Sequence, residues 1–177
     1  ATRETYPSLH RRLDFMELVS GNNLPNSHFR DWTVSNSIPD KWVKSKSGTH
    51  NSTFTYPVTG IVGTKAARVT VSSYISGESK WLFDEISVIP DNTYSFHNQY
   101  TSTTSTKLVA LIRRTNGSIQ TLQLGTFPAS ATWKSVDKTF YVPANTKSVT
   151  VYQLISANGS LTVDDFSLKI NGYAYAN

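Results

Sequence analysis

The sequence predicts an all-β protein, an antiparallel jelly-roll β-sandwich, and three observations support this prediction. The chain is rich in Thr, Val and aromatic residues, which suit the half-buried surface of a strand. Short alternating segments recur along it, separated by turn residues, as in a sandwich. Only 16% of the 177 residues are charged, whereas 45 are Ser or Thr. This composition argues against a protein built from long helices, and the length fits one domain.

The N-terminal segment reads differently from the rest. Ser8 precedes an amphipathic pattern of Leu9, Leu13 and Met16, which is typical of a short helix with a Ser cap. We therefore expect an N-terminal extension or linker at residues 1–21, a jelly-roll domain at 22–170 and a C-terminal tail at 171–177. The extension lacks the apolar stretch of a secretory signal.

Eleven strands are expected after the extension. Asn116-Gly117 and Asn158-Gly159 lie between apolar segments and predict two-residue hairpin turns, and Pro90, Pro128 and Pro143 bound other strands. In most strands alternation places apolar residues on one side, which faces inward. In 107–114 both faces are apolar, so this strand is expected to be covered on both sides or to line a groove with its outer side. The predicted strands, in order, are 23–30, 41–46, 50–57, 65–73, 79–89, 93–102, 107–114, 118–125, 132–142, 147–156 and 160–170.

The sequence offers little for catalysis. It has no cysteine, which excludes a thiol nucleophile, a cysteine-ligated zinc site and an iron–sulfur cluster. The four histidines lack zinc spacing, and neither a Gly-x-Ser-x-Gly motif nor a phosphate-binding loop occurs. A two-carboxylate glycosidase would need Glu85 with a partner across a cleft, because the adjacent Asp84 points to the opposite face. We predict that the chain is not an enzyme.

The charge and hydropathy patterns also limit the partners. The net charge is +5, but the Lys and Arg residues are scattered and form no long basic run. Nucleic acid is therefore not expected as a partner. No stretch of eighteen apolar residues occurs, so membrane insertion is not expected either.

Four motifs, in order along the chain, resemble carbohydrate-binding modules of families four, nine and twenty-two. Leu24-Pro-Asn-Ser-His-Phe29, followed by Pro39-Asp-Lys-Trp42, is similar to the opening of these modules. Ile86-Ser-Val-Ile-Pro90 before Thr93-Tyr-Ser-Phe96 is similar to their valine–proline turn. The segments 131–143 and 161–168 resemble the last strands, the latter with an Asp-Asp pair. The resemblance implies a galactose-binding-like jelly roll that binds a polysaccharide or oligosaccharide on a concave face without catalysis.

The predicted sugar-binding face follows from strand alternation. A sugar ring stacks its C–H face on an aromatic ring, and its hydroxyls bond to short polar side chains. We predict that Trp81 and Phe83 face outward, opposite Leu82, and that His97, Gln99 and Tyr152 also lie on the non-core side. Trp42 and Trp133 are expected in the core. The binding residues predicted on this basis are Trp81, Phe83, His97, Gln99 and Tyr152.

The resemblance also implies a structural calcium ion. Asp164 and Asp165 match the closing-strand part of that site, whereas Arg30 stands where the family has an acidic residue. Calcium prefers oxygen ligands and negative charge, so Asp31 is the candidate replacement.

Two function classes follow from these observations. The first is a lectin-like module, extracellular or on the cell surface, that serves in targeting or adhesion and is joined to a catalytic or surface protein. The alternative is a jelly-roll structural subunit of a surface layer, fibre or capsid, which self-assembles by docking residues 1–21 on a neighbour.

Overall fold

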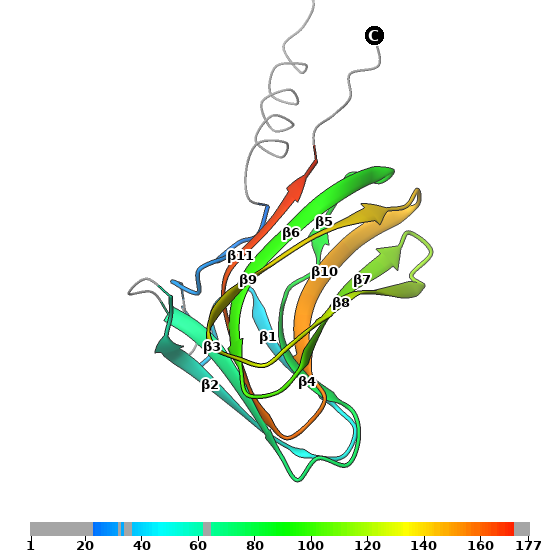
Figure 1. Ribbon diagram of the computed structural model, residues 1–177. Helices are drawn as coiled ribbons and strands as arrows, with labels where there is room; N and C mark the ends of the chain where they lie inside the picture. Colours follow the sequence, from blue (N-terminus) through cyan, green and yellow to red (C-terminus); the bar gives the residue numbers. More distant parts are fainter. Residues whose placement is uncertain (1–22, 32, 34–36, 62–64, 172–177) are drawn as a thin grey trace, which may run out of the picture.

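The computed structural model describes residues 23–171, apart from 32, 34–36 and 62–64. These residues form two antiparallel sheets packed face to face, which confirms the predicted sandwich (Figure 1). The described part of the chain contains no helix long and apolar enough to cross a membrane. The predicted extension at 1–21 lies outside the described residues, as does all of the predicted tail except Asn171.

The first sheet carries strand β10 at its centre. Its order is β1-β4-β10-β7-β8, and the short β5 also pairs with β10. The bounds are β1 Trp42–Ser47, β4 Glu78–Phe83, β5 Ile86–Ser87, β7 Thr106–Arg114, β8 Ile119–Phe127 and β10 Thr146–Ile155.

The second sheet carries β11 at its centre, in the order β2-β3-β11-β6-β9. Figure 1 shows it as a separate layer, with β11, β6 and β9 side by side. The bounds are β2 Asn51–Thr59, β3 Lys65–Ser72, β6 Asn92–Ser102, β9 Ser130–Val142 and β11 Gly159–Ile170.

Two of the predicted strands are wrong. Residues 23–30 form turns, and Asn26 and Phe29 have positive φ values of 51° and 54°, which depart from the extended backbone of a regular strand. The Asn26 side-chain amide donates to the backbone oxygens of Asp31 and Asp40 and holds this turn together. The predicted strand 79–89 is interrupted after Phe83, and only Ile86 and Ser87 continue as β5.

The core between the sheets is aromatic where the opening turn inserts. Phe29 is fully buried, with its ring centroid 4.4 Å from that of Trp42 and 5.8 Å from that of Phe166. Offset and edge-on aromatic contacts of this kind stabilise a core beyond the area they bury. The segment mispredicted as a strand therefore closes one end of the sandwich by inserting a side chain.

A polar bridge crosses the core elsewhere. The Asn98 amide on β6 donates to the Gln153 side-chain oxygen on β10 at 2.9 Å, and the Gln153 amide donates to Thr106 Oγ1 at 2.7 Å. Both amide side chains are buried. The amide nitrogens of Asn98 and Gln153 and the Gln153 oxygen find partners in this bridge, which joins the two sheets directionally, whereas the buried Asn98 oxygen has no hydrogen-bond partner among the described residues.

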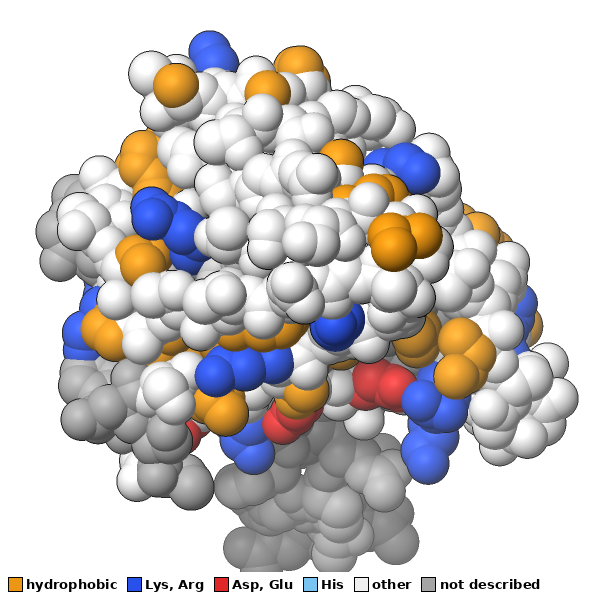
Figure 2. All heavy atoms as spheres, turned by 90° about the horizontal axis from the view of Figure 1, so that it is seen from below, with side chains coloured by type: hydrophobic (Ala, Val, Ile, Leu, Met, Phe, Trp, Pro, Cys, Tyr) orange, Lys and Arg blue, Asp and Glu red, His pale blue; other side chains and the backbone are white. Residues whose placement is uncertain are grey.

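The surface has the low charge density that the composition indicates. In Figure 2 the Lys and Arg side chains are scattered over the face shown and do not gather into one basic patch. The large hydrophobic side chains exposed among the described residues are dispersed in the sequence: Ile38, Val43, Ile75, Ile119 and Tyr141.

Candidate functional site

The outer face of the first sheet carries an aromatic side chain among aliphatic ones. Tyr152 on β10 pairs with Val109 on β7, and Val109 pairs with Gln123 on β8. The next outward row is Thr150, Leu111 and Thr121. On β4, Leu82 and Lys80 face the same way. We call this surface the Tyr152 face, made of Lys80, Leu82, Val109, Leu111, Thr121, Gln123, Thr150, Tyr152 and Leu154.

Lys80 covers the Tyr152 ring. Its Nζ lies 4.5 Å from the ring centroid and also pairs with the Glu78 carboxylate. Tyr152 is consequently only 5% exposed. Burial, and then the Glu78 charge, raise the pKa of the Tyr152 phenol. The phenol therefore stays protonated and keeps a hydroxyl that can donate as well as accept a hydrogen bond.

An ion pair stands at one end of this sheet. Arg113 Nε and Nη2 contact the Glu85 carboxylate at 2.6–3.0 Å, and the Ser148 hydroxyl donates to it at 2.6 Å. The Arg113 hydrogen bonds lower the pKa of Glu85. A general acid in a glycosidase needs a raised pKa and a second carboxylate. Glu85 has instead a lowered pKa and a guanidinium partner, which does not fit the glycosidase hypothesis.

The outer face of the second sheet carries a polar network around His97. His97 Nδ1 lies 2.8 Å from Asp137 Oδ1 on β9, and its Nε2 lies 3.6 Å from Asp165 Oδ2 on β11. Asp165 also receives a hydrogen bond from Gln99 at 3.3 Å and lies 3.3 Å from His28 Nδ1. We call this surface the His97 face, made of Ser95, His97, Gln99, Asp137, Thr139, Asp165, Ser167 and Lys169.

The predicted orientation of Trp81 and Phe83 is wrong. They are 1% and 0% exposed and belong to the core. Trp81 Nε1 donates to the Arg68 backbone oxygen, and the ring packs edge-on against Phe54 with the centroids 5.5 Å apart. The alternation of this strand was correct, but its inner and outer sides were exchanged. The two largest side chains take the inner side because they bury more apolar area than Leu82 does.

The predicted binding residues therefore do not form one surface. His97, Gln99 and Tyr152 face away from the core, as predicted, but they lie on opposite sheets of the sandwich. Lys80 and Asp137 lie on these two faces but are absent from the predicted binding residues. Once Trp81 is placed inward, alternation puts Lys80 outward, whereas Asp137 becomes recognisable only when β9 is paired with β6.

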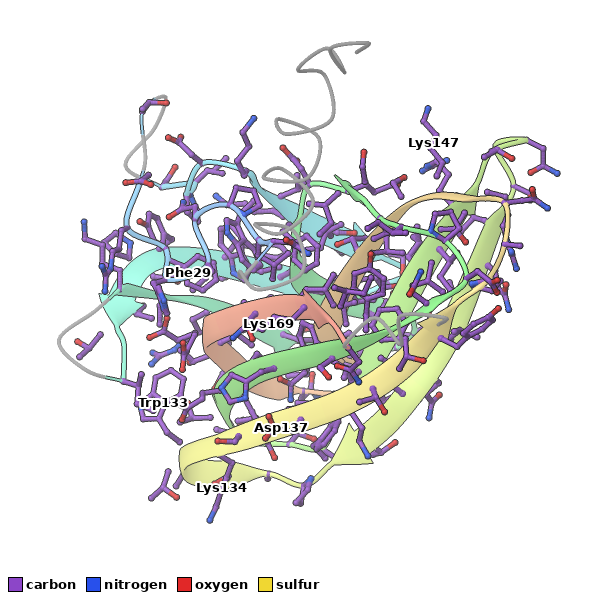
Figure 3. All side chains as sticks on the ribbon, turned by 90° about the horizontal axis from the view of Figure 1, so that it is seen from above. Phe29, Trp133, Lys134, Asp137, Lys147 and Lys169 are labelled. Atoms are coloured by element: carbon purple, nitrogen blue, oxygen red, sulfur yellow. The ribbon has the colours of Figure 1, made fainter. Side chains whose placement is uncertain are left out.

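The two remaining tryptophans that the structure describes differ from each other. Trp42 is 3% exposed and belongs to the core, as predicted. Trp133 is only partly buried and lies outside the core cluster, so the prediction of a core position is wrong. It stands near the start of the edge strand β9, where the pairing with β6 shifts register and fewer neighbours are present to bury it (Figure 3).

The carboxylates predicted to bind calcium are held by hydrogen-bond donors. Asp164 is buried and accepts the Ile61 N–H at 3.1 Å and the Asp165 N–H at 2.7 Å. Asp165 faces the two histidines. No three acidic or histidine side chains of the described residues form a group suited to a metal. These contacts do not resemble a calcium cage, and calcium binding by Asp164 and Asp165 stays an untested prediction.

Comparison with known proteins gives similarity of structure and not of sequence. No family model matches the chain, and no curated protein matches it. The fold is similar to the enzymatically active domain of bacteriophage CBA120 tailspike protein 4, with a TM-score of 0.65, 15% identity, and coverage of 85% of this chain and 21% of that chain. It is also similar to the CBM22-1 and GH10 modules of Clostridium thermocellum xylanase 10B in complex with xylohexaose. The TM-score is 0.65 at 15% identity, with coverage of 86% of this chain and 29% of that chain.

A xylan-binding domain of family 22 matches over nearly its whole length. The TM-score is 0.62 at 12% identity, covering 88% of this chain and 99% of that domain. The fold is a jelly roll of the carbohydrate-binding-module type. The resemblance inferred from the four motifs is thus confirmed at the level of the fold. By contrast, the chain spans only about a fifth of the tailspike chain and 29% of the xylanase chain.

Proposed function

We propose that this chain binds a polysaccharide or oligosaccharide on the Tyr152 face and catalyses no reaction. The observation that carries the proposal is the position of Tyr152, an aromatic side chain at the centre of an outer sheet face. Its cross-strand neighbour Val109 is apolar, and Gln123 and Thr121 on β8 are polar and exposed. This arrangement matches the two chemistries of a sugar ring, an apolar face and a hydroxyl rim.

Lys80 lies over the Tyr152 ring, where a ligand would have to displace it. A lysine side chain is flexible, and an ammonium over an aromatic ring gains only about 0.5–2 kcal/mol. A ligand that displaces Lys80 from the ring can then accept a hydrogen bond from its ammonium. Glu78, its ion-pair partner on the same strand, holds the displaced amine close to the site.

The fold comparisons support this proposal, because a family 22 module and a xylan-binding domain share this sandwich. A role in targeting or adhesion outside the cell, beside a catalytic or surface module, belongs to the same proposal. The alternative of self-assembly depends on residues 1–21, which lie outside the described residues, and nothing on the described surface favours it.

The test compares Tyr152→Leu with Tyr152→Phe, using soluble xylan in affinity gel electrophoresis and xylohexaose in calorimetry, followed by cellulose and mannan fragments. Tyr152→Leu removes the ring and should weaken binding at least tenfold, whereas Tyr152→Phe keeps the ring and should retain most affinity. Thr70→Ala, an exposed position on β3 in the other sheet, is the matched control. Unchanged binding by a folded Tyr152→Leu protein, or no binding to any of these glycans by the natural chain, would overturn the proposal.

A further inference from the structure

The His97 face contains a cavity of about 890 Å³ that the proposed function does not use. Most of its lining comes from β11, β6 and β9, which are neighbours in the second sheet, and Leu124 comes from β8, an edge strand of the first sheet. Figure 3 shows two of its labelled residues, Lys169 and Asp137, on the strands at either side of β6. Its lining is mostly polar: Ser95, His97, Asp137, Lys138, Thr139, Ser167 and Lys169, with Phe96 and Leu124 as the apolar part.

Strand pairing arranges this lining in two parallel rows. One row runs from Ser167 through His97 to Asp137, and the next runs from Lys169 through Ser95 to Thr139. Residues of one row are two positions from those of the other, which separates the rows by about 7 Å. The cavity therefore offers a grid of hydroxyls, with a carboxylate and an ammonium on opposite strands.

The central imidazole of this grid is held in place. His97 is positioned between Asp137 and Asp165, and Asp165 is contacted in turn by Gln99 and His28. Side chains fixed by their neighbours lose little further entropy when a ligand binds. Asp137 nevertheless keeps 72% of its side chain exposed, so its carboxylate can accept hydrogen bonds from a ligand.

The lining indicates the chemical class of the ligand. Hydroxyls that donate and accept, beside one acceptor-only carboxylate and the donor-only ammonium groups of Lys138 and Lys169, complement a molecule with several neighbouring hydroxyls. Lys138 alternates with Asp137 and Thr139 along β9, and its Nζ lies 5.9 Å from the centroid of the Phe127 ring on β8. The charged groups of the two rows are therefore Asp137 and Lys169, which balance, so a strongly ionic ligand has no advantage there. A large apolar ligand would leave the polar rows without partners.

We propose that this cavity is a second saccharide site, which takes a neutral sugar residue by hydrogen bonding and not by ring stacking. It lies on the sheet opposite the Tyr152 face, so the chain is bivalent for carbohydrate. The choice of ligand class rests on the proposed function, but the site does not depend on Tyr152. Two sites on opposite faces can bridge two polysaccharide chains and raise the overall avidity.

The experiment uses the full chain with xylohexaose, followed by amide NMR shifts and calorimetry. The natural chain should show two separate sets of shifted amides, near Tyr152 and near His97. The double variant Asp137→Ala/Lys169→Ala should lose the shifts at the His97 face, weakening that site at least fivefold, and keep those at the Tyr152 face. Both positions are exposed, and Thr70→Ala is the matched control on the same sheet.

Bridging gives an independent measurement. The natural chain should cross-link soluble xylan and raise its turbidity, and removing either site should abolish this. Shifts confined to the Tyr152 face, or unchanged cross-linking by the folded Asp137→Ala/Lys169→Ala protein, would overturn the second site and leave the proposed function standing. Shifts confined to the His97 face would overturn the proposed Tyr152 site and support this one.

Discussion

The two outer faces of the sandwich differ in their chemistry and in how far their central side chains are exposed. On the Tyr152 face the central side chains are already packed: Thr150, Tyr152 and Leu154 are all at most 5% exposed, under the cover of longer neighbours such as Lys80. On the His97 face the central residues are polar and open, and Asp137 has 72% of its side chain in solvent. One face presents apolar area behind Lys80, whose side chain is itself 11% exposed, and the other presents fixed hydrogen-bonding groups around a cavity.

This difference shows that one fold can carry two chemically different outer surfaces. The inner residues of both sheets are alike, because both must fill one core. The outer residues are free of that demand and differ in chemistry. Fold similarity therefore predicts the sandwich but not which outer face binds a ligand, and each face must be tested by its own variants.

The largest expected effect is a loss of stability on substitution of Trp81, a core residue that belongs to neither outer face. Trp81→Ala leaves a cavity between the sheets and removes the hydrogen bond to Arg68, so we expect it to lower the free energy of unfolding by about 3–5 kcal/mol. Urea denaturation measures this change, and Trp81→Phe should lose less. A Trp81→Ala protein of unchanged stability that binds no glycan would instead place Trp81 on the ligand and reverse the assignment of the faces.

A smaller effect is expected at the polar bridge that joins the sheets behind the two faces. Gln153→Leu removes the partner of the buried Asn98 amide and should cost about 1–3 kcal/mol of unfolding free energy. The double variant Asn98→Leu/Gln153→Leu should recover part of the loss, since both polar groups are then gone. Additive losses in a urea double-mutant cycle would show that the bridge contributes no coupling between the sheets.

The smallest effect concerns pH and is confined to the Tyr152 side of the molecule. Arg113 lowers the pKa of Glu85 below its ordinary 4.5 in the folded state. A lowered folded-state pKa contributes stability above the unfolded pKa, and this contribution disappears as pH falls through the folded value. Stability should thus decline below about pH 4.5, and the decline should be shallower in Glu85→Gln. Identical pH profiles from thermal unfolding would contradict this.

The sequence predicts the fold well because the fold depends on period and turn chemistry. The alternation in residues 65–73 and the Asn-Gly turn at 116 are local signals, and strands β3, β7 and β8 follow them closely. The hairpin predicted at Asn158-Gly159 is wrong, because β10 and β11 on either side of it belong to different sheets and this connection crosses from one sheet to the other. The segment 23–30 fails because its turn depends on hydrogen bonds from Asn26 to Asp31 and Asp40, the latter fourteen residues away. No local pattern reveals such a contact.

The candidate sites were less predictable, for a physical reason. Alternation states which residues share a side but not which side is the core, so Trp81 and Phe83 were assigned to the wrong one. Alternation also says nothing about sheet membership. His97 and Tyr152 both point outward, yet β6 and β10 belong to different sheets, and only strand pairing shows this.

The bridge between Asn98 and Gln153 has a consequence for the geometry of binding. Asn98 follows His97 in the chain and Gln153 follows Tyr152, so each outward group stands beside one end of the same cross-core hydrogen bond. A directional bond resists sliding of one sheet over the other in a way that apolar packing does not. Two glycan chains held on the opposite faces would then be kept at a constant separation, set by the sheet spacing of about 10 Å and the side chains beyond it. In such a network the protein would act as a rigid spacer between the two glycan chains and not as a flexible linker.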